Sequence, residues 1–226
     1  MSAKESEQNK IIKTRPPVVV VLGHVDHGKS SLLEAIKDFK ITSKESGGIT
    51  QHIGAYEVKM EGGRKITFID TPGHEAFSAM RSRGTEVADI ALLVIDAAQS
   101  VQLQTKEAIE VIKRAEIPMI VVLNKIDLGT ANPQKIKIEL SKIEIFVESM
   151  GGQIPCIEVS AKEKTGINEL LEMILLVSEM RDLKQDLNER TEGLVIESYM
   201  DSAKGPVATV IVKKGILKKK DIIATD

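Results

Sequence analysis

The sequence predicts an α/β fold with a six-stranded, mainly parallel sheet, followed by the start of a β-barrel. Two observations support this prediction. Short, continuously apolar and β-branched runs alternate with helical patterns up to Met180, and strand-like runs with no helix between them come after it. Continuously apolar runs are typical of strands covered on both faces, and their alternation with helices favours right-handed crossovers and a parallel sheet.

The expected elements follow one another in a regular order. Five apolar runs are expected strands: Val18–Leu22, Ile66–Ile69, Ile90–Ile95, Ile117–Leu123 and Pro155–Val159. Residues 55–59 precede the second of these runs across a glycine-containing turn, and we expect them to form its antiparallel hairpin partner. Helical patterns occupy residues 30–37, 75–87, 102–115, 133–149 and 167–180.

The domain boundaries are expected where the composition changes. Residues 1–15 are polar and mixed in charge, as in a flexible leader, and residues 16–181 hold the alternating pattern of the first domain. Residues 182–192 are an expected polar linker. Strand-like runs then follow at 193–200, 206–213 and 221–224. Because three strands leave apolar edges uncovered, we expect residues 193–226 to be an incomplete β-barrel domain.

The composition is that of an ordinary globular protein. Hydrophobic residues make up 42% and charged residues 28% of the 226 residues, and the formal net charge is −2, so any nucleic-acid contact needs a local patch. A lysine cluster, Lys213, Lys214 and Lys218–Lys220, fits either such a contact or a solvated strand edge. Cys156 is the chain's one cysteine, and no apolar run near the start is long enough to cross a membrane, so the chain is expected in the cytoplasm. We also expect it to be a monomer.

The first motif that carries chemistry lies between an expected strand and an expected helix. Residues 23–30 read GHVDHGKS, which fits the P-loop pattern of glycine, four residues, Gly-Lys-Ser. In a P-loop, backbone N–H groups surround phosphate oxygens. Lys29 would then neutralise the β- and γ-phosphates, and the Ser30 hydroxyl would ligate Mg²⁺. A chance glycine-rich turn is the alternative, and the position between a strand and a helix favours the P-loop.

A second motif, DTPG at residues 70–73, ends the Ile66–Ile69 strand. An aspartate at this place, Asp70, can hold Mg²⁺ through a water molecule, and the Gly73 amide can reach a γ-phosphate. Alone, this tetrapeptide is more often a plain β-turn. Its position on the next strand after the P-loop favours the phosphate site.

Two further motifs end the later strands and indicate a guanine site. Residues 124–127 read NKID, and residues 160–162 read SAK. The Asp127 carboxylate can accept hydrogen bonds from N1–H and the exocyclic amine of guanine, whereas adenine would leave it unpaired. A polar strand end followed by a helix cap is the alternative interpretation. The carboxyl ends of the strands in an open α/β sheet are where ligands bind, so the four motifs support one another.

Together these motifs resemble those of the translational GTPases, and in particular of bacterial-type translation initiation factor 2. The resemblance is closest at Gly47–Tyr56, Pro72–Phe77 and Gly205–Val210. It implies GTP and GDP as ligands, Mg²⁺ as cofactor, ribosome-stimulated GTP hydrolysis, and the ribosome and initiator tRNA as partners, the tRNA through domains absent from this chain. Other translational GTPases, the archaeal or eukaryotic counterpart, a nucleotide-binding fragment without turnover, and a P-loop ATPase or kinase remain alternatives.

The resemblance also implies roles for single residues. Thr50 would bind Mg²⁺ when a γ-phosphate is present. His74, flanked by the apolar pair Val25 and Ile49, would position the attacking water. Asp26 would lie near the β–γ bridging oxygen, with a monovalent cation as a candidate bridge. The expected nucleotide-binding residues are thus Val25, Asp26, His27, Gly28, Lys29, Ser30, Ser31, Gly73, Asn124, Lys125, Asp127, Ser160, Ala161 and Lys162. The expected metal ligands are Ser30, Thr50 and Asp70, and the expected catalytic residue is His74.

Two features fit less simply. The loop Ala98–Leu103 lacks the acidic residues and the proline that the resemblance implies, which leaves its shape open. A metal site at His24 and His27 is an alternative use of the P-loop histidines, although the pair has neither further ligands nor the helical spacing of zinc enzymes.

Overall fold

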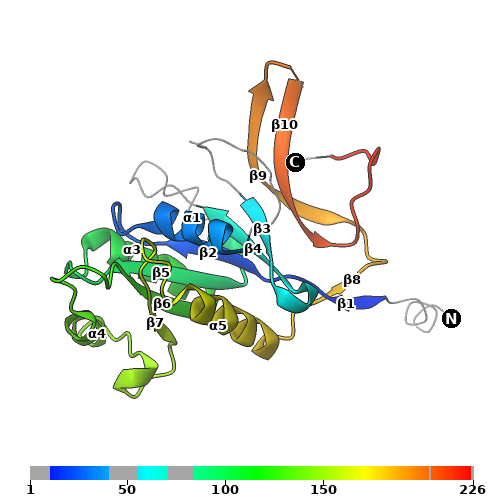
Figure 1. Cartoon of the computed structure of the whole chain (residues 1–226). Coiled ribbons are helices and arrows are strands. Elements are labelled where there is room, and N and C mark those ends of the chain that lie inside the picture. Colours follow the sequence, from blue (N-terminus) through cyan, green and yellow to red (C-terminus); the bar gives the residue numbers. More distant parts are fainter. Residues whose placement is uncertain (1–10, 41–54, 71–83, 204, 225–226) are drawn as a thin grey trace. The chain divides into compact units, whose positions relative to one another are not determined.

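The structure, a computed structural model, describes residues 11–40, 55–70, 84–203 and 205–224 (Figure 1). The chain divides into two compact units. The larger unit is Pro16–Arg181, and the smaller one combines residues up to Arg15 with those from Asp182 onward.

The larger unit is built on a six-stranded sheet in the order β3-β4-β2-β5-β6-β7. Its strands are β2 (Val18–Leu22), β3 (Ala55–Lys59), β4 (Lys65–Asp70), β5 (Ile90–Asp96), β6 (Met119–Asn124) and β7 (Cys156–Glu158). All neighbouring strands run parallel except β3, which pairs antiparallel with β4. This arrangement confirms the predicted mainly parallel sheet and its one antiparallel hairpin.

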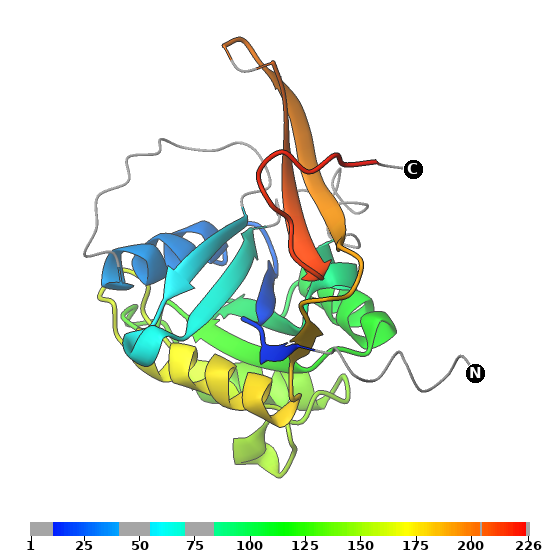
Figure 2. The same ribbon diagram turned by 90° about the vertical axis from the view of Figure 1, so that its right-hand side faces the viewer.

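Helices cover both faces of this sheet (Figure 2). They are α1 (Lys29–Lys40), α3 (Leu103–Ala115), α4 (Pro133–Ser141) and α5 (Ile167–Met180). Alternate residues of each strand point to opposite faces, so Val21 packs with α1 and α5 while Val20 packs with α3 and α4. This is why the central strands β2, β5 and β6 are buried along their whole length and almost entirely apolar. Among the described helices, none is both long enough and apolar enough to cross a membrane.

The helix expected at 133–149 is shorter than predicted. It ends at Ser141, and a 3₁₀ turn, η3 (Glu148–Met150), follows after an irregular segment. Glu144 has a left-handed backbone (φ 62°), which does not fit inside an α-helix. Ile145 and Val147 are buried while Phe146 between them is exposed, which is the alternation of extended chain. The apolar residues of this segment therefore pack as extended chain.

The expected helix at 75–87 lies mostly outside the described residues. Of its residues, 84–87 are described and are helical.

The smaller unit contains two antiparallel strand pairs. β1 (Ile12–Thr14) pairs with β8 (Lys184–Asp186), and β9 (Glu192–Asp201) pairs with β10 (Gly205–Lys214). The expected leader and linker thus each contain a short strand, which their polar composition did not predict. Residues 221–224 are not the predicted strand but irregular chain, with Ile222 99% exposed, because no strand in the described part of the chain lies beside them.

Candidate functional site

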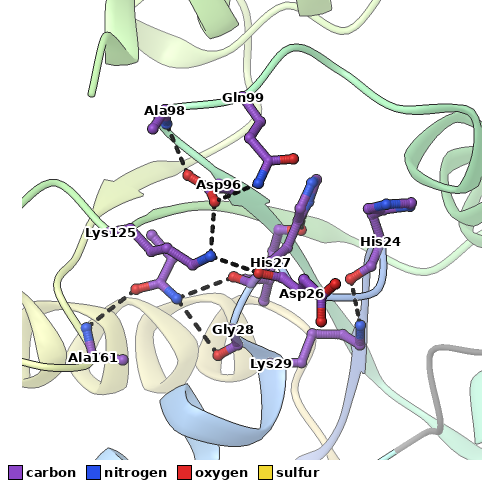
Figure 3. A network of polar contacts seen from close by, with 12 residues as sticks. His24, Asp26, His27, Gly28, Lys29, Asp96, Ala98, Gln99, Lys125 and Ala161 are labelled. Atoms are coloured by element: carbon purple, nitrogen blue, oxygen red, sulfur yellow. Dashed lines mark hydrogen bonds and ion pairs between the residues drawn. The ribbon is translucent and has the colours of Figure 1, made fainter. Parts of the chain in front are cut away.

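The predicted motifs meet at one edge of the larger unit's sheet. Gly23 directly follows β2, and Asp70, Asp96 and Asn124 are the last residues of β4, β5 and β6. Because these four strands are parallel, their carboxyl ends share this edge. Figure 3 shows the polar network that connects the loops there.

The loop of residues 23–28, the expected phosphate-binding loop, contains two left-handed backbone positions besides Gly23. Asp26 (φ 64°) and Gly28 (φ 81°) are left-handed, and such reversals turn successive N–H groups toward one point. At Gly23 a Cβ atom would lie 2.3 Å from the Val94 carbonyl oxygen, so the loop can pass β5 only without a side chain. The Lys29 ammonium donates to the His24 carbonyl at 2.6 Å across the loop.

His27 is the buried anchor of this loop. Its side chain is 0% exposed, and its Nδ1 lies 3.3 Å from the Val94 carbonyl oxygen. A carbonyl can only accept, so the neutral ring carries its proton on Nδ1. Burial lowers the pKa of His27 to about 4, with the His24 and Lys29 charges acting in the same direction.

Among the described residues, the histidine pair of the alternative metal site gathers no further metal ligand. The His24 and His27 rings meet edge to face with their centroids 4.9 Å apart. Within the described ranges, no three histidine, cysteine or acidic side chains are grouped so that they could hold a metal ion. The pair therefore packs the loop against the sheet.

Asn124 links the phosphate-binding loop to the loop after β7. Its side chain is 1% exposed, its Nδ2 donates to the His27 carbonyl at 3.1 Å, and its Oδ1 accepts from the Ala161 N–H at 3.1 Å. A Cβ atom on Gly28 would lie 2.4 Å from the Asn124 amide nitrogen. One buried amide thus fixes the distance between the two loops.

Asp127 and Ser160 form the second link between loops. The Ser160 hydroxyl donates to Asp127 Oδ1 at 2.7 Å and accepts from the Glu163 N–H at 3.0 Å. The Ser160 hydrogen bond is the main cause that lowers the pKa of the exposed Asp127 carboxyl, and the Lys162 and Lys125 charges add to it. Asp127 is therefore an ionised acceptor with lone pairs left for a ligand.

Two residues that the motifs did not identify also contact the phosphate-binding loop or its partners. Gln104 Oε1 accepts from the Val25 N–H at 3.1 Å. Asp96 Oδ2 lies 2.8 Å from the Lys125 ammonium, which in turn donates to the Asp26 carbonyl at 2.6 Å. The available signal for Asp96 was its position, because it ends a buried strand as Asp70 and Asn124 do.

The chemistry of the candidate metal ligands suits Mg²⁺. Ser30, in the first turn of α1, offers a hydroxyl, and Asp70, opposite Val21 in the β2–β4 ladder, offers a carboxylate. Hard oxygen donors of this kind are what Mg²⁺ prefers. Burial raises the pKa of Asp70, against the opposing charges of Lys29 and Lys37.

The remaining predicted residues are outside this network or outside the described residues. Ser31 and Lys162 are exposed beside the two linked loops. Thr50, Gly73 and His74, together with Ile49, lie outside the described residues, so their roles stay predictions.

Comparisons with known proteins agree with this geometry. The chain is 52% identical over 216 residues to translation initiation factor IF-2 of Chloroflexus aggregans, and 50% identical over 223 residues to that of Mesoplasma florum. These matches cover 96% and 99% of this chain but 29% and 36% of the relatives, so the chain spans about a third of their length.

Solved structures show the same fold. GDP-bound aIF5B from Aeropyrum pernix matches with a TM-score of 0.75 at 32% identity, over 92% of this chain and 44% of that one. Translation elongation factor SelB from Methanococcus maripaludis, in complex with the GTP analogue GPPNHP, matches with a TM-score of 0.72 at 26% identity, again over 92% and 44%. The family model of the elongation factor Tu GTP binding domain matches residues 14–179, and the chain belongs to that family.

Proposed function

We propose that the chain is the GTP-binding part of a translation initiation factor of the IF-2 type, which binds GTP and GDP with Mg²⁺ and hydrolyses GTP. The observation that carries the proposal is Asp127, an exposed and ionised carboxylate held by Ser160 at the same sheet edge as the phosphate-binding loop. The names of relatives about 50% identical over nearly the whole chain support the role in initiation.

Guanine selection follows from the chemistry of Asp127. Ser160 holds Oδ1, and the carboxylate can still accept from the N1–H and the amine of guanine. Adenine presents an acceptor at N1, so the carboxylate would be desolvated without a donor. Sites built on such pairing reject the wrong ligand by about 10⁴-fold.

The phosphates would bind to the loop of residues 23–28 and the start of α1. The left-handed turns at Asp26 and Gly28 aim backbone N–H groups at an anion, and the N-terminus of α1 adds its positive dipole end. The Lys29 ammonium, which contacts the His24 carbonyl, can exchange that contact for phosphate oxygens. Ser30 and Asp70, with Thr50, would hold Mg²⁺, which supplies charge neutralisation at the β- and γ-phosphates.

Hydrolysis would depend on His74 as the group that orients the attacking water. Val25 and Ile49 would keep its ring away from that water until the ribosome rearranges these segments. Without the ribosome, turnover should stay on the order of the 10⁻⁴ to 10⁻² s⁻¹ typical of unstimulated GTPases. Initiator tRNA would bind through parts of the relatives' length that this chain does not span.

The test uses a hybrid in which this chain replaces the matching segment of the Mesoplasma florum factor. We expect ribosomes to stimulate its GTP turnover, and His74→Ala to abolish this stimulation while GTP affinity stays nearly unchanged. GTP binding without ribosome-stimulated turnover in the parent hybrid would reduce the chain to a nucleotide-binding fragment. A His74→Ala hybrid that still responds fully would remove His74 from the mechanism.

A further inference from the structure

Asp96 is a buried carboxylate that belongs to none of the predicted nucleotide-binding motifs. It ends β5, is 1% exposed, and lies opposite Asn124 in the β5–β6 ladder. Its Oδ1 accepts from the Ala98 N–H at 2.8 Å, and its Oδ2 accepts from Gln99 Nε2 at 3.0 Å (Figure 3). These two neutral donors hold the loop that follows β5, but they do not balance the negative charge of the Asp96 carboxylate. A buried charge without an opposite charge nearby destabilises the fold.

Lys125 supplies the opposite charge and also contacts the phosphate-binding loop. Its ammonium lies 2.8 Å from Asp96 Oδ2 and donates to the Asp26 carbonyl at 2.6 Å. The Lys125 side chain is 31% exposed, so water competes for it. Lys125 and Asp26 both have left-handed backbones with φ 64°, which is unfavourable for residues other than glycine. Two strained turns are therefore joined by one ammonium group.

We propose that Asp96 is a positioning residue for nucleotide binding. Its charge holds the Lys125 ammonium on the Asp26 carbonyl and so keeps the phosphate-binding loop in the conformation that binds phosphate. This role rests on the proposed function, because it presupposes that the loop binds GDP and GTP. The same ion pair also fixes the turn that leads from Lys125 to Asp127, so one buried charge orders both the phosphate and the base side.

The physical reason is preorganisation. A lysine side chain is long, flexible and strongly hydrated, and without the carboxylate its ammonium would turn to water. The Asp26 carbonyl would then lose its partner, and the loop would have to be ordered again whenever nucleotide binds. A binding-competent shape that is populated only in part weakens the observed affinity by that fraction.

The discriminating variant is Asp96→Asn. The asparagine oxygen can still accept from the Ala98 N–H, so the loop after β5 keeps its cap, but no charge faces Lys125. Because hydrogen bonds to charged groups are worth more than neutral ones, we expect GDP to dissociate about tenfold faster. Gln99→Ala is the matched control: it removes the other donor to the same carboxylate oxygen, leaves the ion pair, and should leave GDP dissociation unchanged.

A double-mutant cycle separates positioning from a general structural role. If Asp96 acts through Lys125, Asp96→Asn should have no further effect on GDP dissociation in a Lys125→Gln background. A role in folding alone would instead lower the urea unfolding midpoint and give the same effect in both backgrounds. If Asp96→Asn alone folds poorly, GDP dissociation is compared between the double variant and Lys125→Gln. In the double variant neither partner of the ion pair keeps an unbalanced charge.

The outcomes are distinct. Faster GDP dissociation in Asp96→Asn, absent in Gln99→Ala and lost in the Lys125→Gln background, supports the proposal. If the parent binds GDP and Asp96→Asn leaves GDP dissociation unchanged, or speeds it equally in both backgrounds, the positioning role alone is overturned. Failure of the parent chain to bind GDP overturns the proposed function and this role with it.

Discussion

The two halves of the candidate nucleotide site are built very differently. On the phosphate side, His27 is fully buried, and contacts from Val94, Asn124, Lys125 and Gln104 hold the loop in place. On the base side, Asp127 is exposed, and Ser160 holds its side chain. The difference teaches that the loop on the phosphate side is part of the packed sheet edge, whereas the base selection that we propose would depend on one exposed carboxylate.

The largest expected effect is on the base side, where Asp127→Asn should change the preferred ligand. Xanthine has a carbonyl where guanine has its amine, and the asparagine NH₂ can donate to it. The preference for GDP over xanthosine diphosphate should fall by up to about 10⁴-fold, because a polar pair is broken for one ligand and made for the other. Competitive displacement of a fluorescent nucleotide measures this, and the urea unfolding midpoint should not move. Unchanged GDP affinity would refute the role of Asp127.

On the phosphate side, Gly28→Ala should damage the fold itself. The new methyl group would lie against the Asn124 amide and displace it from His27 and Ala161, while the left-handed backbone (φ 81°) adds strain. We expect the free energy of unfolding to fall by about 4 kcal/mol, the sum of the strain and the lost hydrogen bonds.

Gly151→Ala is the matched control for this substitution, since Gly151 also has φ 81° but nothing within 4 Å of its Cβ position. It should cost about 1 to 2 kcal/mol, the strain alone. Equal losses in the two variants, measured by urea denaturation without nucleotide, would show that the Asn124 link does not stabilise the loop.

A smaller effect on the phosphate side should appear as a pH dependence. The pKa of His27 is about 4 in the folded chain and 6.5 in a free histidine, so between these values the unfolded chain binds more protons. Stability should therefore fall as the pH drops from about 6.5 to about 4, by about 3 kcal/mol in total. His27→Asn, whose amide can donate to Val94, should lack this loss. Parallel pH dependences of parent and variant in urea denaturation would contradict the buried, neutral state of His27.

The sheet could be predicted from sequence because its strands are covered on both faces. The central runs, such as Val18–Leu22, are apolar throughout, so their pattern differs from that of the helices and loops nearby. The P-loop and NKID motifs could be predicted because their residue types stand at fixed spacings, although the structure shows that His27 and Asn124 within them are also buried in the fold.

Other features could not be predicted, because their cause lies in contacts between distant segments. Residues 12–14 and 184–186 are mostly polar and pair through their backbones, which no periodicity records. The end of α4 depends on the left-handed backbone at Glu144. Asp96 belongs to the site because Lys125 reaches it across the β5–β6 edge, and a sequence shows that neighbourhood only after the sheet order is known.

Calorimetric titration of the chain with GDP and with ADP, each in the presence of Mg²⁺, tests the central claim most directly. With the phosphate side shared by both ligands, Asp127 alone should discriminate between them, so GDP should bind about 10⁴-fold more tightly than ADP. ADP binding as tight as that of GDP, or no binding of either, would contradict a guanine-nucleotide site at this sheet edge.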